Sequence, residues 1–310
     1  MKQRSFALRG DLCWSRDARH LNTVKDGWLV CVDGRSAGVF ETLPEQYAGL
    51  PREDWSGRLV LPGLVDLHVH APQYTFRGLG MDLELLDWLD RHAFPEEARY
   101  ADLDYARAAY SRFVEDMKHS PNTRACVFAT LHGPATRLLM DLLEESGLVA
   151  MVGKVNMDRN APDNLRESCP EAAELETRRW LDASAGRYER VTPILTPRFV
   201  PSCTDDLMAR LGELRREFDV PVQSHLSENQ GEVALVQELC PWSRFYGDAY
   251  DRFGLFGGDH NCIMAHCVLS GDEEIALMKE RGVYVAHCPQ SNTNLASGIA
   301  PVRRYLGEGL

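Results

Sequence analysis

The chain has 310 residues, of which 44% are hydrophobic and 26% charged, and its formal net charge at pH 7 is −12. This length and composition allow one large core and a small accessory module. The acidic balance argues against a nucleic-acid partner, because phosphate binding needs a basic surface and the sequence has no run of Lys or Arg. No segment approaches the roughly 20 apolar residues that cross a bilayer, so we expect a soluble protein without a membrane partner.

Nine cysteines are scattered along the chain, and no two of them form a CxxC pair. An odd, unpatterned set in a chain of this length is typical of reduced thiols, most of them small core residues. We therefore predict a cytoplasmic protein.

Residues 1–60 are predicted to form a small β-sandwich-like module. Short β-rich segments at 6–10, 27–32 and 37–40 are separated by Gly, Asp and Ser, which favour turns.

From residue 59 onward, apolar runs alternate with stretches of helical periodicity. The runs are Leu59–Val69, Ala125–Leu131, Val149–Val155, Val191–Leu195, Val220–Val222, Cys262–Ala265 and Val283–Ala286; the helices are predicted at 99–118, 134–147, 170–187, 204–218, 230–240 and 272–281. Such alternation is typical of parallel βα units. Seven units exceed the need of a five-stranded open sheet and approach a (β/α)8 barrel. We therefore predict an α/β protein in which residues 61–310 form a (β/α)8 TIM-like barrel with seven of the eight strands present.

Histidines gather where the predicted strands end, and barrel active sites are built at the carboxyl ends of the strands. His68 and His70 are two residues apart in one strand, so both point to the same face. Neutral imidazoles suit zinc and other borderline divalent cations. His225 and His266 end later runs, and four histidines at equivalent positions favour a metal site over four ordinary core histidines.

Glu228 lies three residues after His225. A carboxylate just beyond a metal ligand can move a proton between water and substrate if its pKa is raised. A Glu near a helix N-terminus, favoured by the helix dipole, is the ordinary structural interpretation, and the two are compatible.

Several segments, taken in order, resemble the amidohydrolase superfamily and, within it, the guanine deaminases. The superfamily segments are PGLVDLHVH at 62–70, SHLSEN at 224–229 and MAH at 264–266; the narrower resemblance adds HAPQY at 70–74, DWL at 87–89, VGKVNMD at 152–158, TPRF at 196–199 and HCPQSN at 287–292. Together they extend from about residue 60 to residue 298, and the N-terminal module is similar too, although less distinctively.

The resemblance implies an enzyme that hydrolyses guanine to xanthine and ammonia with one zinc ion per chain. It implies that His68, His70 and His225 bind zinc, that His266 contacts the reacting centre, and that Glu228 carries the proton.

The resemblance also implies a substrate-binding set. Gln73 would read the purine edge, Arg198 and Phe199 would clamp the purine, and His225 would contact the substrate as well as the metal. The chemistry agrees, because an amide pairs with a ring edge, Arg donates to O6 and Phe stacks on the ring. His287 receives no catalytic role, and Trp88 is expected as an apolar helix anchor more than as a pocket wall.

The family pattern ends with an aspartate after the eighth strand, which serves as a zinc ligand and general base. The sequence ends at Leu310 before that position, so no residue is nominated, and we expect an incomplete barrel and β-module with impaired catalysis. The zinc base deaminases that carry PCxxC are excluded, because there is no CxxC.

Two alternatives stay open: an amidohydrolase for another heterocycle, such as 8-oxoguanine, cytosine or a triazine, and a non-catalytic metal-binding descendant. Gln73 and the TPRF segment favour guanine. The sequence does not reveal the oligomeric state, and the resemblance makes a homodimer the candidate assembly.

Overall fold

The computed structural model describes residues 5–17 and 19–310, and the chain divides into two compact units, residues 1–64 and 65–310. The first unit is a four-stranded sheet of order β3-β2-β1-β4, in which β1 pairs antiparallel with β2 and parallel with β4. Its elements are β1 (Phe6–Asp17), β2 (His20–Val32), β3 (Arg35–Phe40), η1 (Glu45–Tyr47) and β4 (Arg52–Val60).

The three strands predicted in this unit lie within β1, β2 and β3, but β4 was not predicted. Its sequence, REDWSGRLV, is mostly exposed and lacks the alternation that marks a half-buried strand. The β2–β3 turn is locally encoded, since Asp33 and Gly34 both have positive φ, as a two-residue hairpin turn of this type requires.

In the second unit, seven successive strand positions lie beside one another in chain order. The strands are β5 (Leu64–His70), β6 (Asn122–Phe128), β7 (Val149–Gly153) with β8 (Val155–Asn156), β9 (Val191–Pro193) with β10 (Thr196–Pro197), β11 (Val222–Leu226), β12 (Cys262–His266) and β13 (Val283–Ala286). The sheet β5-β6-β7-β9 is joined to β11-β12-β13 by a parallel bridge between Leu195 and Val222. Within residues 5–17 and 19–310, no hydrogen-bonded pairing connects β13 to β5.

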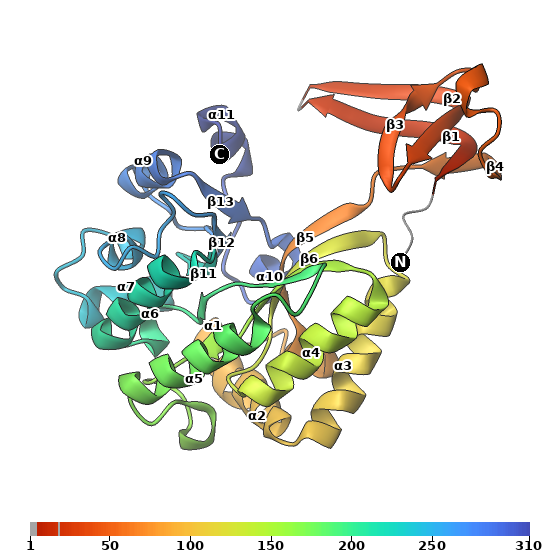
Figure 1. The fold of residues 1–310 in the computed structure, drawn as a ribbon. Helices are drawn as coiled ribbons and strands as arrows, with labels where there is room; N and C mark the ends of the chain where they lie inside the picture. Colours follow the sequence, from red (N-terminus) through yellow and green to blue (C-terminus); the bar gives the residue numbers. More distant parts are fainter. Residues whose placement is uncertain (1–4, 18) are drawn as a thin grey trace. The chain divides into compact units, whose positions relative to one another are not determined.

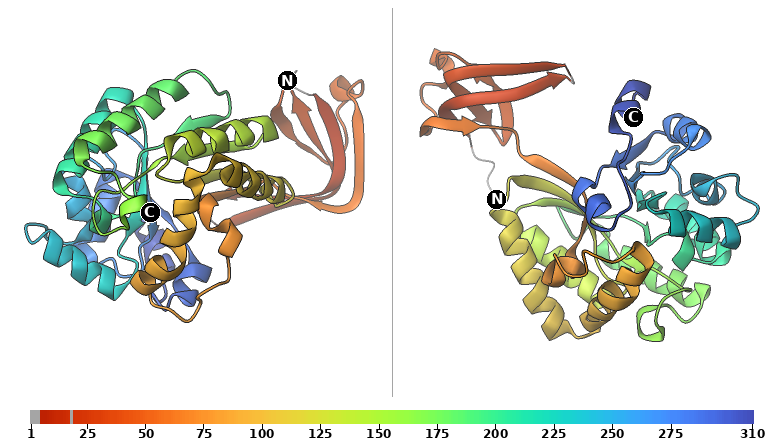
Figure 2. Two further views of the ribbon diagram at one scale, coloured as in Figure 1. Left: turned by 90° about the horizontal axis from the view of Figure 1, so that it is seen from below. Right: turned by 180° about the vertical axis from the view of Figure 1, so that it is seen from behind.

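Helices follow the strands and cover them on the outside, as Figures 1 and 2 show. The longer ones are α3 (Leu103–Lys118), α4 (Gly133–Ser146), α5 (Pro170–Ser184), α6 (Asp205–Phe218), α7 (Gln230–Leu239) and α9 (Asp272–Arg281). All six were predicted, to within a few residues at their ends. The helix predicted from residue 99 begins only at Leu103, because the Asp102 side chain caps it by accepting from the N–H groups of Asp104 and Tyr105.

Shorter elements fill the remaining connections: η2 (Ala71–Phe76), α1 (Leu85–Trp88), the π-turn η3 (Leu89–Ala93), α2 (Phe94–Ala98), η4 (Arg99–Ala101), η5 (Asp163–Leu165), η6 (Val200–Ser202), α8 (Tyr246–Asp251), α10 (Pro289–Asn294) and α11 (Val302–Glu308).

The apolar run Leu59–Val69 was predicted as a single strand, and this prediction is wrong. Leu59 and Val60 end β4, residues 61–63 are not in a strand, and β5 starts at Leu64. Pro62 and Gly63 explain the break, because neither residue favours a strand interior.

The side chains of each strand separate into two layers. In β12, Cys262 and Met264 join the large apolar core against the helices, while Ile263 and Ala265 join a small cluster with Cys126, Ile194 and Ala286. Because side chains alternate along a strand, the small cluster marks the face turned away from the helices. The described part of the chain has no helix that is both long and apolar enough to span a membrane.

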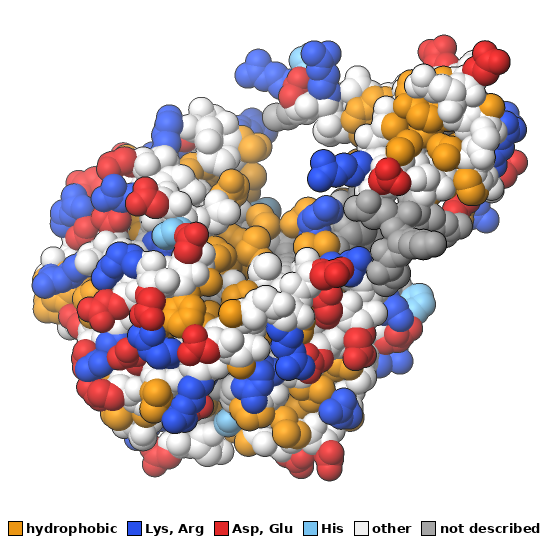
Figure 3. Space-filling model, viewed as in Figure 1, with side chains coloured by type: hydrophobic (Ala, Val, Ile, Leu, Met, Phe, Trp, Pro, Cys, Tyr) orange, Lys and Arg blue, Asp and Glu red, His pale blue; other side chains and the backbone are white. Residues whose placement is uncertain are grey.

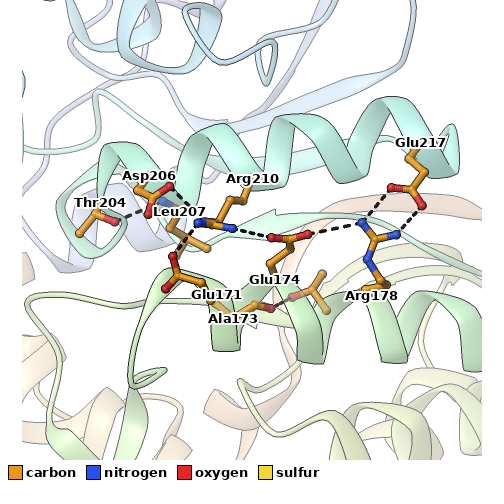
Figure 4. A network of polar contacts seen from close by, with 10 residues as sticks. Glu171, Ala173, Glu174, Arg178, Thr204, Asp206, Leu207, Arg210 and Glu217 are labelled. Atoms are coloured by element: carbon orange, nitrogen blue, oxygen red, sulfur yellow. Dashed lines mark hydrogen bonds and ion pairs between the residues drawn. The ribbon is translucent and has the colours of Figure 1, made fainter.

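Helices α5 and α6 are joined along their outer sides by alternating charges (Figure 4). Arg178 of α5 pairs with Glu217 of α6, and Arg210 of α6 pairs with Glu174 and Glu171 of α5. Partly exposed pairs of this kind contribute modestly to stability, although a network orients the two helices. On the face drawn in Figure 3, basic and acidic side chains are similarly intermixed over the second unit.

Candidate active site

Three imidazoles converge at the carboxyl ends of β5 and β11. The ligand nitrogens of His68, His70 and His225 all lie within 4.8 Å of one another. The Nε2 atoms of His70 and His225 are 3.0 Å apart. Two nitrogens that share one tetrahedral zinc ion, each at about 2.0–2.1 Å, lie about 3.3 Å apart. The pair therefore already has nearly the separation of two ligands of one cation.

The protonation state of the three rings also suits a cation. Burial lowers the pKa of each ring well below its usual value, and the charges of neighbouring histidines and of Arg198 lower it further. The rings are thus neutral near pH 7, which is the form that binds metal. His225 Nδ1 lies 2.6 Å from the carbonyl oxygen of Arg198, so Nδ1 donates and Nε2 keeps its lone pair. His70 Nδ1 is buried without a hydrogen-bond partner among the described residues. The donor set fits a borderline divalent cation.

His266 ends β12 beside this cluster, with its ring centroid 5.3 Å from that of His68. Its Nδ1 lies 2.7 Å from Asn292 Oδ1 and 3.3 Å from Glu228 Oε1. An amide oxygen only accepts, so His266 Nδ1 donates to it and the ring's Nε2 is left as an acceptor. Burial lowers the pKa of His266, which favours this neutral form. With His68 and Cys288, His266 also forms a second group of donor atoms within 4.8 Å.

Glu228 is buried just after β11, with 3% of its surface exposed. Burial raises the pKa of its carboxyl group, and the charge of Glu84 raises it further. The peptide N–H groups of Glu228 and Asn229 donate to Glu232 Oε2, at 3.0 and 3.3 Å, within a capping box that opens α7. Glu228 thus stands at a helix N-terminus, and its raised pKa meets the condition that the sequence set for moving a proton.

The backbone is constrained where β11 and β12 end. Ser227, His266 and Cys267 have φ values of 46°, 73° and 48°, in the left-handed region that non-glycine residues seldom adopt. Two backbone hydrogen bonds hold this geometry, from Cys267 N to Leu226 O at 2.9 Å and from Leu269 N to Ser227 O at 2.8 Å. Such outliers cluster at functional sites, where surrounding structure maintains them.

The predicted substrate-binding residues lie on two short segments. Gln73 belongs to η2, and Arg198 and Phe199 follow β10 with both side chains buried. Gln73 and Arg198 converge on one residue that the sequence did not suggest, Glu97 of α2. Phe199 packs in an apolar cluster that also includes Phe128.

Phe128 is a second residue that sequence reasoning missed. Its ring is stacked on His70 at 4.4 Å and lies 4.9 Å from His68 and 4.8 Å from His225. In the sequence it lies inside the apolar run Ala125–Leu131, so nothing distinguishes it from core. Trp88 donates its Nε1–H to Leu79 O and packs on the cluster that includes Phe199.

The sequence model of a protein family, described as "Amidohydrolase family", matches residues 59–310, which is most of the chain. The chain belongs to the amidohydrolase family.

Relatives of this amidohydrolase carry one recurrent name. This chain is 42% identical over 256 residues to a probable guanine deaminase of Schizosaccharomyces pombe, and the match covers 82% of this chain and 48% of the relative. It is 42% identical to guanine deaminase of Homo sapiens, covering 93% and 63%. The chain therefore spans about half to two thirds of the length of these curated relatives.

Solved structures confirm the barrel. A crystal structure of guanine deaminase from C. acetobutylicum with bound guanine superposes with a TM-score of 0.96 at 44% identity, covering 99% of this chain and 73% of that one. A triazine hydrolase superposes with a TM-score of 0.87 at 17% identity, and this shows a common fold only. The predicted amidohydrolase-type (β/α) barrel with an N-terminal β-module is thus confirmed.

Proposed function

We propose that this chain carries the active site of a zinc-dependent guanine deaminase, which hydrolyses guanine to xanthine and ammonia. The observation that carries the proposal is the similarity to the guanine-bound structure from C. acetobutylicum, which extends over 99% of this chain. The arrangement of the histidine cluster beside a buried, proton-carrying Glu228 supports the same reaction.

In this proposal His68, His70 and His225 hold one zinc ion through neutral imidazole nitrogens. The ion supplies Lewis acidity, which makes water a better nucleophile near neutral pH. The backbone carbonyl of Arg198 fixes the His225 tautomer that this binding needs.

Glu228 moves the protons. As the oxygen of water adds to C2 of guanine, Glu228 delivers its own proton to the adjacent ring nitrogen and takes up a proton from the water. It then delivers this proton to the departing 2-amino group, which leaves as ammonia, and it regains the water's second proton as the C2 carbonyl forms. The raised pKa of the buried carboxyl suits this exchange, because a proton carrier works best when its pKa is near the working pH. His266, held by Asn292, directs its Nε2 to the reacting centre.

The purine is recognised by Gln73, Arg198 and Phe199, which together form the proposed purine-binding wall. Arg198 donates to O6, Gln73 pairs with the ring edge, and Phe199 packs against the ring plane, while His225 contacts both the metal and the substrate.

In the same proposal residues 1–60 are an accessory module, residues 61–310 are catalytic, and the enzyme acts in the cytoplasm. The homodimer implied by the resemblance stays a prediction, which light scattering of the full-length protein checks.

The test of this function is ammonia release by the full-length, zinc-loaded protein from guanine, 8-oxoguanine, cytosine and a triazine. We expect guanine to be turned over with the highest kcat/KM. Preference for another heterocycle would contradict the guanine assignment. A folded, zinc-loaded protein that releases no ammonia from guanine would contradict the proposed reaction altogether.

A further inference from the structure

One buried carboxylate holds both polar side chains of the proposed purine-binding wall. Glu97 is 1% exposed, and its Oε1 accepts from Gln73 Nε2 at 3.1 Å and from Arg198 Nη2 at 3.0 Å. Its Oε2 accepts from Arg198 Nη1 at 2.5 Å. The pair with Arg198 is therefore bidentate, and Arg198 is itself 2% exposed.

This arrangement determines which atoms remain for a ligand. An ionised carboxylate only accepts hydrogen bonds, so the amide nitrogen of Gln73 must face Glu97 and its oxygen must face away. Arg198 uses two of its five N–H groups on Glu97, and the other three stay donors, because a guanidinium has no acceptor and does not lose its charge. The Phe94 ring, 5.2 Å from the guanidinium carbon, covers the group from one face.

We propose that Glu97 is a positioning residue that determines the specificity of the purine site. It fixes an acceptor on Gln73 and donors on Arg198 in one rigid pattern, which matches a purine that has an oxygen at ring position 6. A purine without that oxygen leaves the buried donors of Arg198 unmatched, and a site built to hydrogen-bond a ligand atom rejects analogues that lack it. This inference rests on the proposed function.

The adjacent residue on α2 provides a matched control. Glu96 accepts from Thr75 Oγ1, Tyr105 and Arg99, none of which belongs to the proposed site. Glu96→Gln thus removes one charge from the same short helix without touching Gln73 or Arg198.

The experiment compares the KM for guanine with the inhibition constant of 2-aminopurine, which lacks the 6-oxygen, in the full-length, zinc-loaded enzyme. In Glu97→Gln we expect the KM for guanine to rise about tenfold or more, with the inhibition constant of 2-aminopurine changing less than about threefold. The value of kcat should change much less than KM, because Glu97 does not touch the reacting atoms. Glu96→Gln should leave the KM, the inhibition constant and kcat unchanged.

A second variant covers the case in which Glu97→Gln fails to fold. Glu97→Asp keeps the charge that Arg198 needs but withdraws the carboxylate by one methylene. As in Glu97→Gln, the KM for guanine should therefore rise more than the inhibition constant of 2-aminopurine. Folded, zinc-containing Glu97 variants that discriminate as well as the parent would overturn the inference. If the parent enzyme itself does not deaminate guanine, the proposed function fails instead, and the two failures are therefore distinct.

Discussion

Glu228 is the ionisable residue on which the proposed chemistry depends most directly. Its Oε1 has no hydrogen-bond partner among the described residues and lies 3.3 Å from the ring of His266. Its peptide N–H is fixed by Glu232, whose own pKa is raised by burial and by the charge of Glu228. The side chain is thus held in place through its backbone while its acid group stays available.

We expect Glu228→Gln to lower kcat for guanine about 100-fold or more with little change in KM, because an amide keeps the shape but carries no proton. Steady-state kinetics on zinc-loaded, full-length protein measures both constants. Glu238→Gln, on the exposed side of α7, is the matched control and should behave as the parent does. Near-parental turnover in Glu228→Gln would remove the proposed role.

At the scale of elements, Glu144 connects α4 to the start of β9. Its carboxylate accepts from the N–H groups of Glu189, Arg190 and Val191 at 3.2, 2.9 and 3.1 Å. Burial by itself raises the pKa of Glu144, but these hydrogen bonds outweigh it and the pKa is lowered. A lowered folded-state pKa contributes stability above the unfolded-state pKa, and that contribution is lost as the pH falls through the folded-state value.

Glu144→Gln should therefore lower the free energy of unfolding by about 1 kcal/mol at pH 7. The difference should shrink as the pH falls from the unfolded-state pKa of about 4.3 through the lowered folded-state pKa, because the parent's carboxylate then takes up a proton as well. Urea unfolding at pH 7 and at pH 3.5 measures it, with the exposed neighbour Glu145→Gln as control. A deficit of equal size at both pH values would show that the charge on Glu144 is not the cause.

The secondary-structure elements differ in how well the sequence predicts them. The longer helices and the seven strand positions follow from apolar runs and helical periodicity, and His68 and His70 follow from alternation within one strand. Segment 71–98 was not predicted, because its helices have only four to six residues and are too short to display a period. Glu97 lies there, in a Glu-Glu pair that reads as a solvated helix face, and its contact with Arg198 spans 101 residues.

At the scale of the whole molecule, cation binding should be visible as thermal stability. If the histidine cluster holds zinc, the ion stabilises the folded state by about 2.7 kcal/mol at 100 times its Kd. For a chain of this size we expect the Tm to fall by roughly 4 °C on chelation and to recover with zinc.

Differential scanning fluorimetry of the full-length protein, with and without dipicolinate, measures this shift. His68→Ala should abolish it, whereas His119→Gln, at the exposed end of α3, should retain it. A chelator-independent Tm in a protein that contains zinc would contradict the assignment of the cluster as the binding site.

The ion pair between Glu97 and Arg198 has a consequence for the order in which the protein is assembled on the ribosome. Burying one member of such a pair without the other is strongly unfavourable. At translation rates of about 5–20 residues per second, Arg198 is added roughly 5–20 s after Glu97. During that interval α2 cannot settle into its final place at low cost, and Gln73 has no fixed partner. The wall proposed to recognise the purine therefore cannot form before the first four strands of the barrel have been synthesised.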